Sequence, residues 1–434
     1  MPAHALLYTQ RRTPASTLAV AIGAMLVISF FAYWLSRSPL VGGICYAIGF
    51  LTLTWSRPYL ALLLIMATVP FQQDVSGSDA GLKFSLAEIN LALTIPLWLM
   101  SRRKRHHRAY LFGAALFLYL AISVLASVLH WRAGSSLISL LQMGLYLVVA
   151  VGVFARVPVS LKDYIPGLYA LLAACVVLAI ATVVVRKGYV MTMHKNGVGA
   201  SLATAVVIGV ELWLARPLRV PRRAIAIATA ICLVGLTLSL SRGAWLAAVI
   251  GVFIVFVMRR EYRTIARVSV TLLPVLAIAW MMLPAEKRES AFDFDPNRAN
   301  IKARYESIAL AREKFISSPV FGVGVGVRKE IDATNLWWVT LAETGVLGAA
   351  AFIAIQASLL HMLIRLRRVI SPTDPRFTFV ILGGALAFGR LAHGMFDHYW
   401  SRGALMAAWA AVGMLIRVYG EAPLSPVRSS RAAR

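Results

Sequence analysis

The first side chains with chemical potential lie just before an apolar stretch that begins near residue 198. Lys195, together with the free backbone N–H groups of a helix that starts there, would favour an anion. His194, its neighbour, has an ordinary pKa that suits proton transfer at neutral pH. The alternative interpretation of His194 is a solvated loop histidine with no chemical role.

Arg242 is the second candidate, because it joins two apolar stretches and is followed by Gly243, which allows a tight turn. The planar fork of an arginine side chain suits the oxygens of a phosphate group. The alternative is an arginine at a helix end whose side chain reaches the membrane surface.

Glu343 is the third candidate and lies inside an apolar stretch, about two helical turns after Asn335. A carboxylate within an apolar stretch is costly, so it is either paired with an arginine or used in chemistry. The sequence leaves both interpretations open.

A fourth group surrounds the last turn expected on the same side, and it consists of Arg390, His393, Asp397 and His398. The spacing of the two histidines and the aspartate is a weak metal signal, since zinc sites normally need a further ligand. A hydrogen-bonded turn that includes the following aromatic residues is the favoured interpretation, and we expect no metal and no cofactor.

The composition indicates which elements must position these candidates. The chain has 434 residues, of which 59% are hydrophobic and 14% charged, with a formal net charge of +26. Soluble proteins carry roughly 25% charged residues. Here apolar blocks alternate with short basic clusters, which is the pattern of helices crossing a bilayer. The sequence therefore predicts an all-α, polytopic integral membrane protein with 12–14 transmembrane helices.

The same pattern excludes a soluble enzyme, a secreted disulfide scaffold and a disordered basic protein. Despite the positive charge, we expect the lipid bilayer and not nucleic acid as the partner. The three cysteines each lie within an apolar block and have no CxxC partner, so we interpret them as inert buried thiols.

Lysine and arginine cluster on alternate loops, which predicts their orientation by the positive-inside rule. Both chain termini are expected in the cytoplasm, together with the clusters at 102–105, 216–223, 259–267 and 365–376. One long outer loop, at 285–334, is expected to contain an amphipathic helix. The apolar face of that helix is predicted from residues three, four and seven apart, namely Ile301, Tyr305, Ile308 and Phe315.

The domain organisation predicted from these patterns has four parts. Residues 1–185 form N-terminal transmembrane helices, and residues 186–364 form the core with the outer loop 285–334. Residues 365–418 form C-terminal transmembrane helices, and residues 419–434 form a disordered cytoplasmic tail.

Taken in chain order, these motifs resemble those of the O-antigen ligase and polysaccharide polymerase superfamily. The resemblance covers mainly residues 186–350 and rests on His194-Lys195-Asn196-x-x-Gly199, Ser241-Arg242-Gly243-Ala244-Trp245, the long outer loop with Arg304 and Pro319-x-x-Gly322-x-Gly324, and the segment from Asn335 to Gly348. The first 180 residues match only as a series of membrane spans.

The resemblance implies a metal-independent glycosyltransferase in the bacterial inner membrane, with its active site facing the periplasm. Its donor would be an oligosaccharide linked to undecaprenyl pyrophosphate, and its acceptor a hydroxyl of another glycan or of lipid A–core. The pyrophosphate would be bound by basic residues of the outer face, namely Arg242, Lys195, Arg186 and Arg304.

One departure from the family concerns the base that accepts the hydroxyl proton. The family usually has a histidine just before the asparagine that opens the span after the long loop, whereas this chain has Thr334. His194 or Glu343 could take that role, with His393 as a further candidate.

The residues of the His194-Lys195-Asn196-x-x-Gly199 motif resemble those of exopolysaccharide polymerases, which favours a polymerase of secreted polysaccharide or O-antigen. An O-antigen ligase is the alternative. A lipid-linked oligosaccharide flippase or a secondary transporter is the alternative from another class. A carrier should show related halves, and the two halves of this sequence do not match.

Overall fold

The computed structural model is almost entirely helical in the part of the chain that it describes. The described residues are 15–72, 84–101, 107–131, 134–185, 189–191, 193–218, 220–264, 274, 277–278, 280–281, 285–292, 299–331, 335–400 and 403–422. Of the predicted features, the basic cluster at 102–105 and nearly all of the tail after Glu421 lie outside this set.

A first unit, residues 1–61, contains α1 (Ala15–Ser36), α2 (Pro39–Ser56) and the beginning of α3 (Pro58–Thr68). The two long helices pack closely because glycines of α2 face large side chains of α1. A methyl group on Gly42 would lie 2.8 Å from Tyr33 Cβ, and one on Gly49 would lie 2.7 Å from Met25 Cγ. Small residues allow this backbone approach between membrane helices.

A second unit, residues 62–434, contains the rest of α3 and all later elements. In chain order these are α4 (Leu86–Leu93), α5 (Ile95–Leu99), η2 (His107–Ala109), α6 (Tyr110–Leu129), α7 (Ser135–Met143), the π-helix η3 (Gly144–Ala150), α8 (Val151–Arg156), η4 (Leu161–Tyr164), α9 (Ile165–Val185), β1 (Tyr189–Val190), β2 (Met193–His194), α10 (Lys195–Ala215), α11 (Arg222–Leu238), α12 (Arg242–Arg259), α14 (Ala285–Phe292), α15 (Ala299–Ser317), α16 (Val327–Glu330), α17 (Leu336–Val369), α18 (Phe377–Gly394) and α19 (Ala404–Glu421).

Eight helical segments of the described residues are long and apolar enough to cross a membrane. Four shorter apolar helices accompany them. The predicted class, an all-α polytopic membrane protein, is therefore confirmed, while the total of 12–14 spans stays a prediction.

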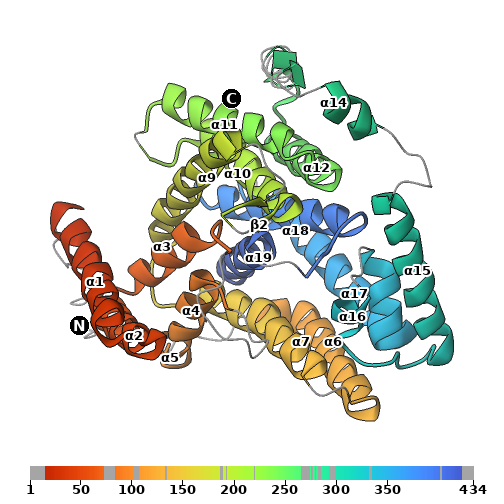
Figure 1. The fold of residues 1–434 in the computed structure, drawn as a ribbon. Helices are drawn as coiled ribbons and strands as arrows, with labels where there is room; N and C mark the ends of the chain where they lie inside the picture. The colour runs from red at the N-terminus through yellow and green to blue at the C-terminus, as the bar shows by residue number, and fades with distance from the viewer. Residues whose placement is uncertain are drawn as a thin grey trace, which may run out of the picture. The chain divides into compact units, whose positions relative to one another are not determined.

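The centre of the second unit is formed by α10, α18 and α19, whose residues are the most thoroughly buried (Figure 1). Helix α18 packs on α12 and α19, and α10 packs on α9, α11 and α12. Glycines again mark the close approaches: a methyl group on Gly251 of α12 would lie 2.5 Å from Val207, and one on Gly383 of α18 would lie 2.6 Å from Leu415.

The loops of the second unit separate into two sets at opposite ends of the helices. Near the last turn of α10, Glu211 pairs with Arg259 at the end of α12, which also donates to the carbonyl of Pro372. In the same region Arg417 donates to Val159 O and Tyr164, and Arg365 donates to Tyr419. The first turns of α10, α12, α17 and α19 and the last turn of α18 lie at the other end, which carries the candidate residues.

The helix predicted in the long outer loop is present as α15, which packs along α17. Its buried side is centred on Ser307 and Ala311, whereas Tyr305 is 63% exposed. The periodicity therefore located the helix. The expectation that its apolar face lies on the outer membrane–water interface stays a prediction.

Helix α17 is interrupted at Gly345, whose backbone is in the left-handed region (φ 63°, ψ −166°). Such a break is tolerated in an apolar bundle only where the freed backbone groups find other partners. The segment Pro319–Gly324 supplies them. Its amides at Val323 and Gly324 donate to the carbonyls of Ala342 (2.8 Å) and Glu343 (3.1 Å).

Below the break the same segment satisfies the first free amides of the second half of α17. The N–H groups of Val346 and Leu347 donate to the carbonyls of Pro319 (2.9 Å) and Val320 (3.4 Å). The glycines of the predicted Pro319-x-x-Gly322-x-Gly324 motif therefore have a physical role, because two backbones meet here with no room for a side chain at Gly322.

Replacing Gly345 with alanine should destabilise the protein by about 1–2 kcal/mol through the left-handed backbone alone, and further through collision with the Val320 carbonyl. Gly113→Ala is the matched control, because a methyl group there meets nothing within 4 Å in a regular helix. Thermal unfolding in detergent should show a lower midpoint for Gly345→Ala only; equal midpoints would contradict the assigned role of the break.

Candidate active site

A short hairpin and a helix start position the first two candidates. Strands β1 and β2 pair antiparallel, with Tyr189 opposite His194, and α10 begins directly afterwards. His194 is the N-cap residue of α10, and its Nδ1 accepts a long hydrogen bond of 3.4 Å from the backbone of Asn196. Lys195 is the first residue of the helix and is half-buried. Both candidates thus lie at the positive end of the α10 dipole.

Gly199 brings this helix start against the start of α12. A methyl group on Gly199 would lie 2.8 Å from Ser241 Cβ and 3.0 Å from Ala244 Cβ. The His-Lys-Asn-x-x-Gly motif and the Ser-Arg-Gly-Ala motif are therefore packed together, and the glycine is what permits the contact. Since four residues of helix rise by about 6 Å, Lys195 lies roughly one turn beyond the point of contact.

The start of α12 has the features of an anion site. Ser241 is its N-cap residue and makes no capping hydrogen bond, and within the described residues its buried Oγ has no hydrogen-bond partner. Arg242 follows as the first helical residue and is half-buried. The Trp245 indole donates to Leu236 O at 2.9 Å, which holds the tight turn before the helix. Two positive helix ends, each with a basic residue at its first position, thus meet here.

Gln72 contacts the start of α10 and the glycine before α19, and no sequence signal indicated it. Its side-chain amide donates to Ser201 Oγ of α10 at 3.2 Å, and its backbone N–H contacts Met193 Sδ at 3.3 Å. Methyl groups on Gly197 and Gly403 would both collide with or press on its side chain. A glutamine at the start of a polar stretch after an apolar helix has no pattern that distinguishes it from a solvated loop residue.

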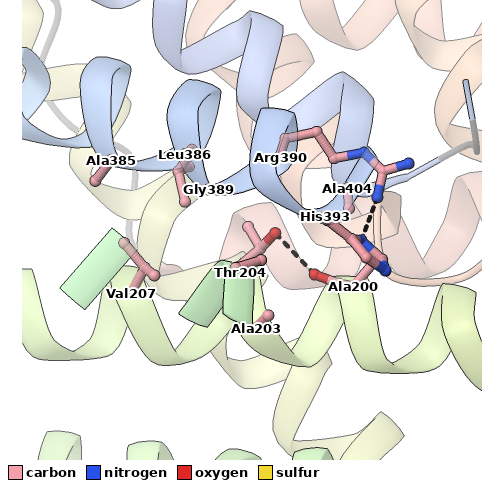
Figure 2. A pocket seen from close by; sticks show the side chains of 11 residues that line it. Ala200, Ala203, Thr204, Val207, Ala385, Leu386, Gly389, Arg390, His393 and Ala404 are labelled. Atoms are coloured by element: carbon pink, nitrogen blue, oxygen red, sulfur yellow. Dashed lines mark hydrogen bonds between the residues drawn. The ribbon is translucent and has the colours of Figure 1, made fainter. Parts of the chain in front are cut away.

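The end of α18 contributes a buried cluster at the same end of the bundle (Figure 2). Arg390 donates through Nη1 to His393 Nδ1 and through Nε and Nη2 to the Tyr399 carbonyl (3.2 and 2.6 Å). Its Nη2 also donates to the carbonyl of His398. His393 Nε2 lies 3.4 Å from Asp397 Oδ2, without the alignment of a hydrogen bond. The predicted hydrogen-bonded turn is thus formed, with Arg390 as its centre.

Asp397 in this turn stays a carboxylate. Its burial acts to raise its pKa, but its interactions with His393 and with the backbone N–H of His398 outweigh burial, and the pKa is lowered below the ordinary aspartate value. The Asp397 side chain accepts from His398 N at 2.7 Å. A fixed negative charge therefore accompanies the Arg390 guanidinium.

A small cavity lies between α10, α12, α18 and α19, beneath these groups (Figure 2). Its volume accessible to water is only about 20 Å³, and it is lined mostly by alanine, glycine and other small side chains. Its polar lining consists of Thr204, Arg390 and His393. Thr204 itself donates to the Ala200 carbonyl, so the histidine and the arginine give the cavity its chemical character.

Glu343 is fully engaged in a buried ion pair. Its Oε2 lies 3.1 Å from Nη1 of Arg328, and its Oε1 accepts from the backbone N–H groups of Gly326 (2.8 Å) and Arg328 (3.2 Å). Arg328 also donates to the Ser139 carbonyl at 3.2 Å. Of the two interpretations of Glu343, the structure contains the ion pair, which fastens the glycine-rich turn to α17 at its break.

The Glu343–Arg328 pair and the start of α17 contact the turn that follows α18. The Arg328 guanidinium stacks 4.6 Å from the centre of the Trp400 ring, which directly follows the Arg390 turn. Asn335 caps α17 by accepting from Trp337 N and Trp338 N, and its amide donates to Met395 O at 3.0 Å. The start of α17 and the end of α18 are thereby held side by side.

The remaining predicted residues are less closely placed. Arg186 and Thr334 lie outside the described residues. Arg304 is on α15 and half-buried, and within the described part of the chain no hydrogen bond or ion pair joins it to the other candidates. The structure therefore brings together His194, Lys195 and Arg242 at two helix starts, with His393 beside them.

Sequence reasoning missed Arg328 altogether, although the basic pair Arg328-Lys329, just after three spaced glycines, was available as a signal. Metal ligands form no cluster in the described residues: no group of three or more histidine, cysteine, aspartate or glutamate side chains there is arranged to hold an ion.

Residues 227–353 match the family model described as O-Antigen ligase. This segment, 127 of the 434 residues, is similar to O-antigen ligases and supports a membrane enzyme of the O-antigen ligase and polymerase type. The matched segment runs from α11 to the first part of α17 and includes Arg242, Arg304 and Glu343. No curated protein matches the chain in a comparison of sequences.

Removing either partner of the buried pair in this segment should destabilise the protein by about 3–5 kcal/mol, because the other charge is left buried and unpaired. We expect Glu343→Ala and Arg328→Ala to lower the unfolding midpoint strongly. The double variant Arg328→Met/Glu343→Leu should cost much less than the sum of the two.

The control is Glu306→Ala, which removes an exposed pair with Lys302 and should change stability by less than about 1 kcal/mol. A Glu343→Ala protein of normal stability that had lost glycan transfer would instead support a chemical role for this carboxylate.

Proposed function

We propose that this protein transfers glycan from an undecaprenyl-pyrophosphate-linked donor to a hydroxyl of a glycan acceptor, at the periplasmic face of the bacterial inner membrane. The proposal rests on one observation above all: the starts of α10 and α12, each led by a basic residue, pack directly against each other through Gly199. The O-antigen ligase match over residues 227–353 supports the reaction class.

The arrangement suits a reaction that expels a pyrophosphate. As the acceptor oxygen forms its bond to the anomeric carbon, the bond from that carbon to the phosphate oxygen breaks, and negative charge builds on the leaving group. Arg242, Lys195 and the two helix dipoles would stabilise that charge. The charge stabilisation comes from the protein itself, so we propose a metal-independent reaction without a cofactor.

His194 is the proposed general base that accepts the proton of the acceptor hydroxyl. It is exposed at the N-cap of α10, next to Lys195. Its hydrogen bond from Asn196 is at the long end of the accepted range, so the imidazole is oriented but still accessible. Glu343 and His393 are both buried in networks of their own.

The distribution of charge supports the proposed orientation. The ends of α10, α12, α17 and α19 that contain Arg259, Arg365 and Arg417 lie opposite the candidate site. Lysine- and arginine-rich loops prefer the cytoplasm, so the site would face the periplasm and both termini the cytoplasm.

The alternative from another class is a flippase or secondary transporter, and the break in α17 is the observation that bears on it. Carriers use interrupted helices whose free backbone groups bind substrate or ions. Here the freed amides and carbonyls are bonded to the segment Pro319–Gly324. The break is thus closed by the chain itself, which favours the enzyme.

Arg242→Ala should lower glycan transfer by about 10²–10³-fold, because it removes a donor to the charge that develops in the transition state. The measurement is product formation by purified protein in nanodiscs with carrier-linked oligosaccharide. Arg263→Ala is the matched control: it deletes an exposed arginine just beyond the other end of α12 and should leave the rate unchanged. Normal product length and yield from Arg242→Ala would refute the proposed site.

The acceptor is tested by supplying the same protein with carrier-linked oligosaccharide, with and without lipid A–core. We expect a ladder of products without the second acceptor, which identifies a polymerase. A single transfer that needs lipid A–core would identify a ligase. Absence of either product, with movement of the carrier-linked glycan across the bilayer, would replace the enzyme by a transporter.

A further inference from the structure

The contacts of His393 determine which of its nitrogens carries the proton. A guanidinium has five donors and no acceptor, so the Nη1 of Arg390 can only donate to His393 Nδ1. Nδ1 must therefore present its lone pair, and the proton of the neutral ring is on Nε2. This tautomer is assigned from the hydrogen-bond pattern.

Arg390 has no freedom to release the ring. Arg390 is only 4% exposed, and its guanidinium donates to two successive carbonyls, those of His398 and Tyr399. Its guanidinium also lies 5.6 Å from the centre of the Tyr399 ring. The arginine is thus fixed by four contacts from the turn that follows α18, and the orientation of His393 is fixed with it.

This tautomer does not suit a general base. A base needs a free lone pair within reach of the hydroxyl, whereas the lone pair of His393 is held by Arg390 and its Nε2–H side faces Asp397, at 3.4 Å. The side chain is also only 2% exposed.

The ring edge has a different neighbour, the first turn of α12. A methyl group on Gly243 would lie 2.6 Å from His393 Cδ2 and 3.2 Å from its Nε2. Gly243 directly follows Arg242. The Cδ2–Nε2 edge of the His393 ring therefore limits how closely the start of α12 can approach α18.

We propose that His393 is a positioning residue, held in its Nε2–H tautomer by Arg390, whose ring seats the first turn of α12 and thereby places Arg242 for the donor pyrophosphate. This inference rests on the proposed function for the identity of the donor. It assigns to Arg390, His393 and Gly243 one shared task, and it leaves His194 as the proposed base.

The test uses size exchange between the two facing residues. The His393→Asn substitution keeps an acceptor for Arg390 but leaves a gap beside Gly243. The Gly243→Ala substitution places a methyl group in the space that the edge of the His393 ring occupies. We expect His393→Asn and Gly243→Ala each to lower kcat/KM for the carrier-linked donor about tenfold, because a displaced Arg242 stabilises the charge on the leaving group less well. The double variant His393→Asn/Gly243→Ala should recover most of the kcat/KM, and the pH profile should not move.

A base would behave differently, because neither asparagine nor alanine accepts a proton. Loss of kcat by about 10²–10⁴-fold in His393→Asn, with no recovery in the double variant, would overturn the proposal. His194→Ala provides the comparison, since it should show that loss. A Gly243→Ala protein with wild-type kcat/KM would also overturn the proposal, and this result does not depend on whether the His393→Asn variant folds.

A second readout does not depend on activity. In protein labelled with ¹⁵N-histidine, the spectrum of wild type minus that of His393→Asn isolates the signals of His393. We expect a protonated Nε2 and an unprotonated, hydrogen-bonded Nδ1; a protonated Nδ1 would refute the inference. If the wild type transferred no glycan from any carrier-linked donor, the proposed function would fail. The protonation state of the two His393 nitrogens would still show whether Arg390 holds the ring in the Nε2–H tautomer.

Discussion

A polar group inside this bundle is costly unless it finds a partner within the chain, because the surrounding apolar side chains and lipid offer none. The break in α17 shows the constraint most directly. Interrupting a helix frees amides and carbonyls on both sides, and the segment Pro319–Gly324 takes up groups on each side of Gly345. The Glu343–Arg328 pair then fixes the end of that segment. The buried arginines at 390 and 417 obey the same rule, each donating to backbone carbonyls.

Close approach between backbones is the second theme, and glycine makes it possible at each functional contact. Gly199 lets α10 meet α12, and Gly243 lets α12 meet the ring of His393. These contacts bring helix starts together whose sequence positions are more than forty residues apart. Two dipoles that each offer a modest attraction to an anion are thereby directed at one place, where their effects combine.

The membrane class could be predicted from the sequence because hydropathy is a sum over many residues, and single ambiguities average out. The candidate residues at helix starts could be predicted as well, since Lys195 and Arg242 border apolar stretches. The partner of Glu343 could not, because Arg328 follows a turn whose path depends on the break in α17. The contact of α15 with α17 could not be predicted for a related reason: periodicity indicates that a helix has an apolar side, but the surface of α17 selects the residues that pack on it, here Ala311 against Ala342.

The closed break in α17 also has a consequence for how the protein is assembled. Residues 319–324 leave the ribosome before residues 342–347, so the closing segment is already present when the broken helix is made. The two segments are only about twenty residues apart in sequence, and their pairing therefore costs little loop-closure entropy. Helix α17 need not enter the bilayer with bare backbone groups at its interruption, because it can be inserted together with the loop that completes it.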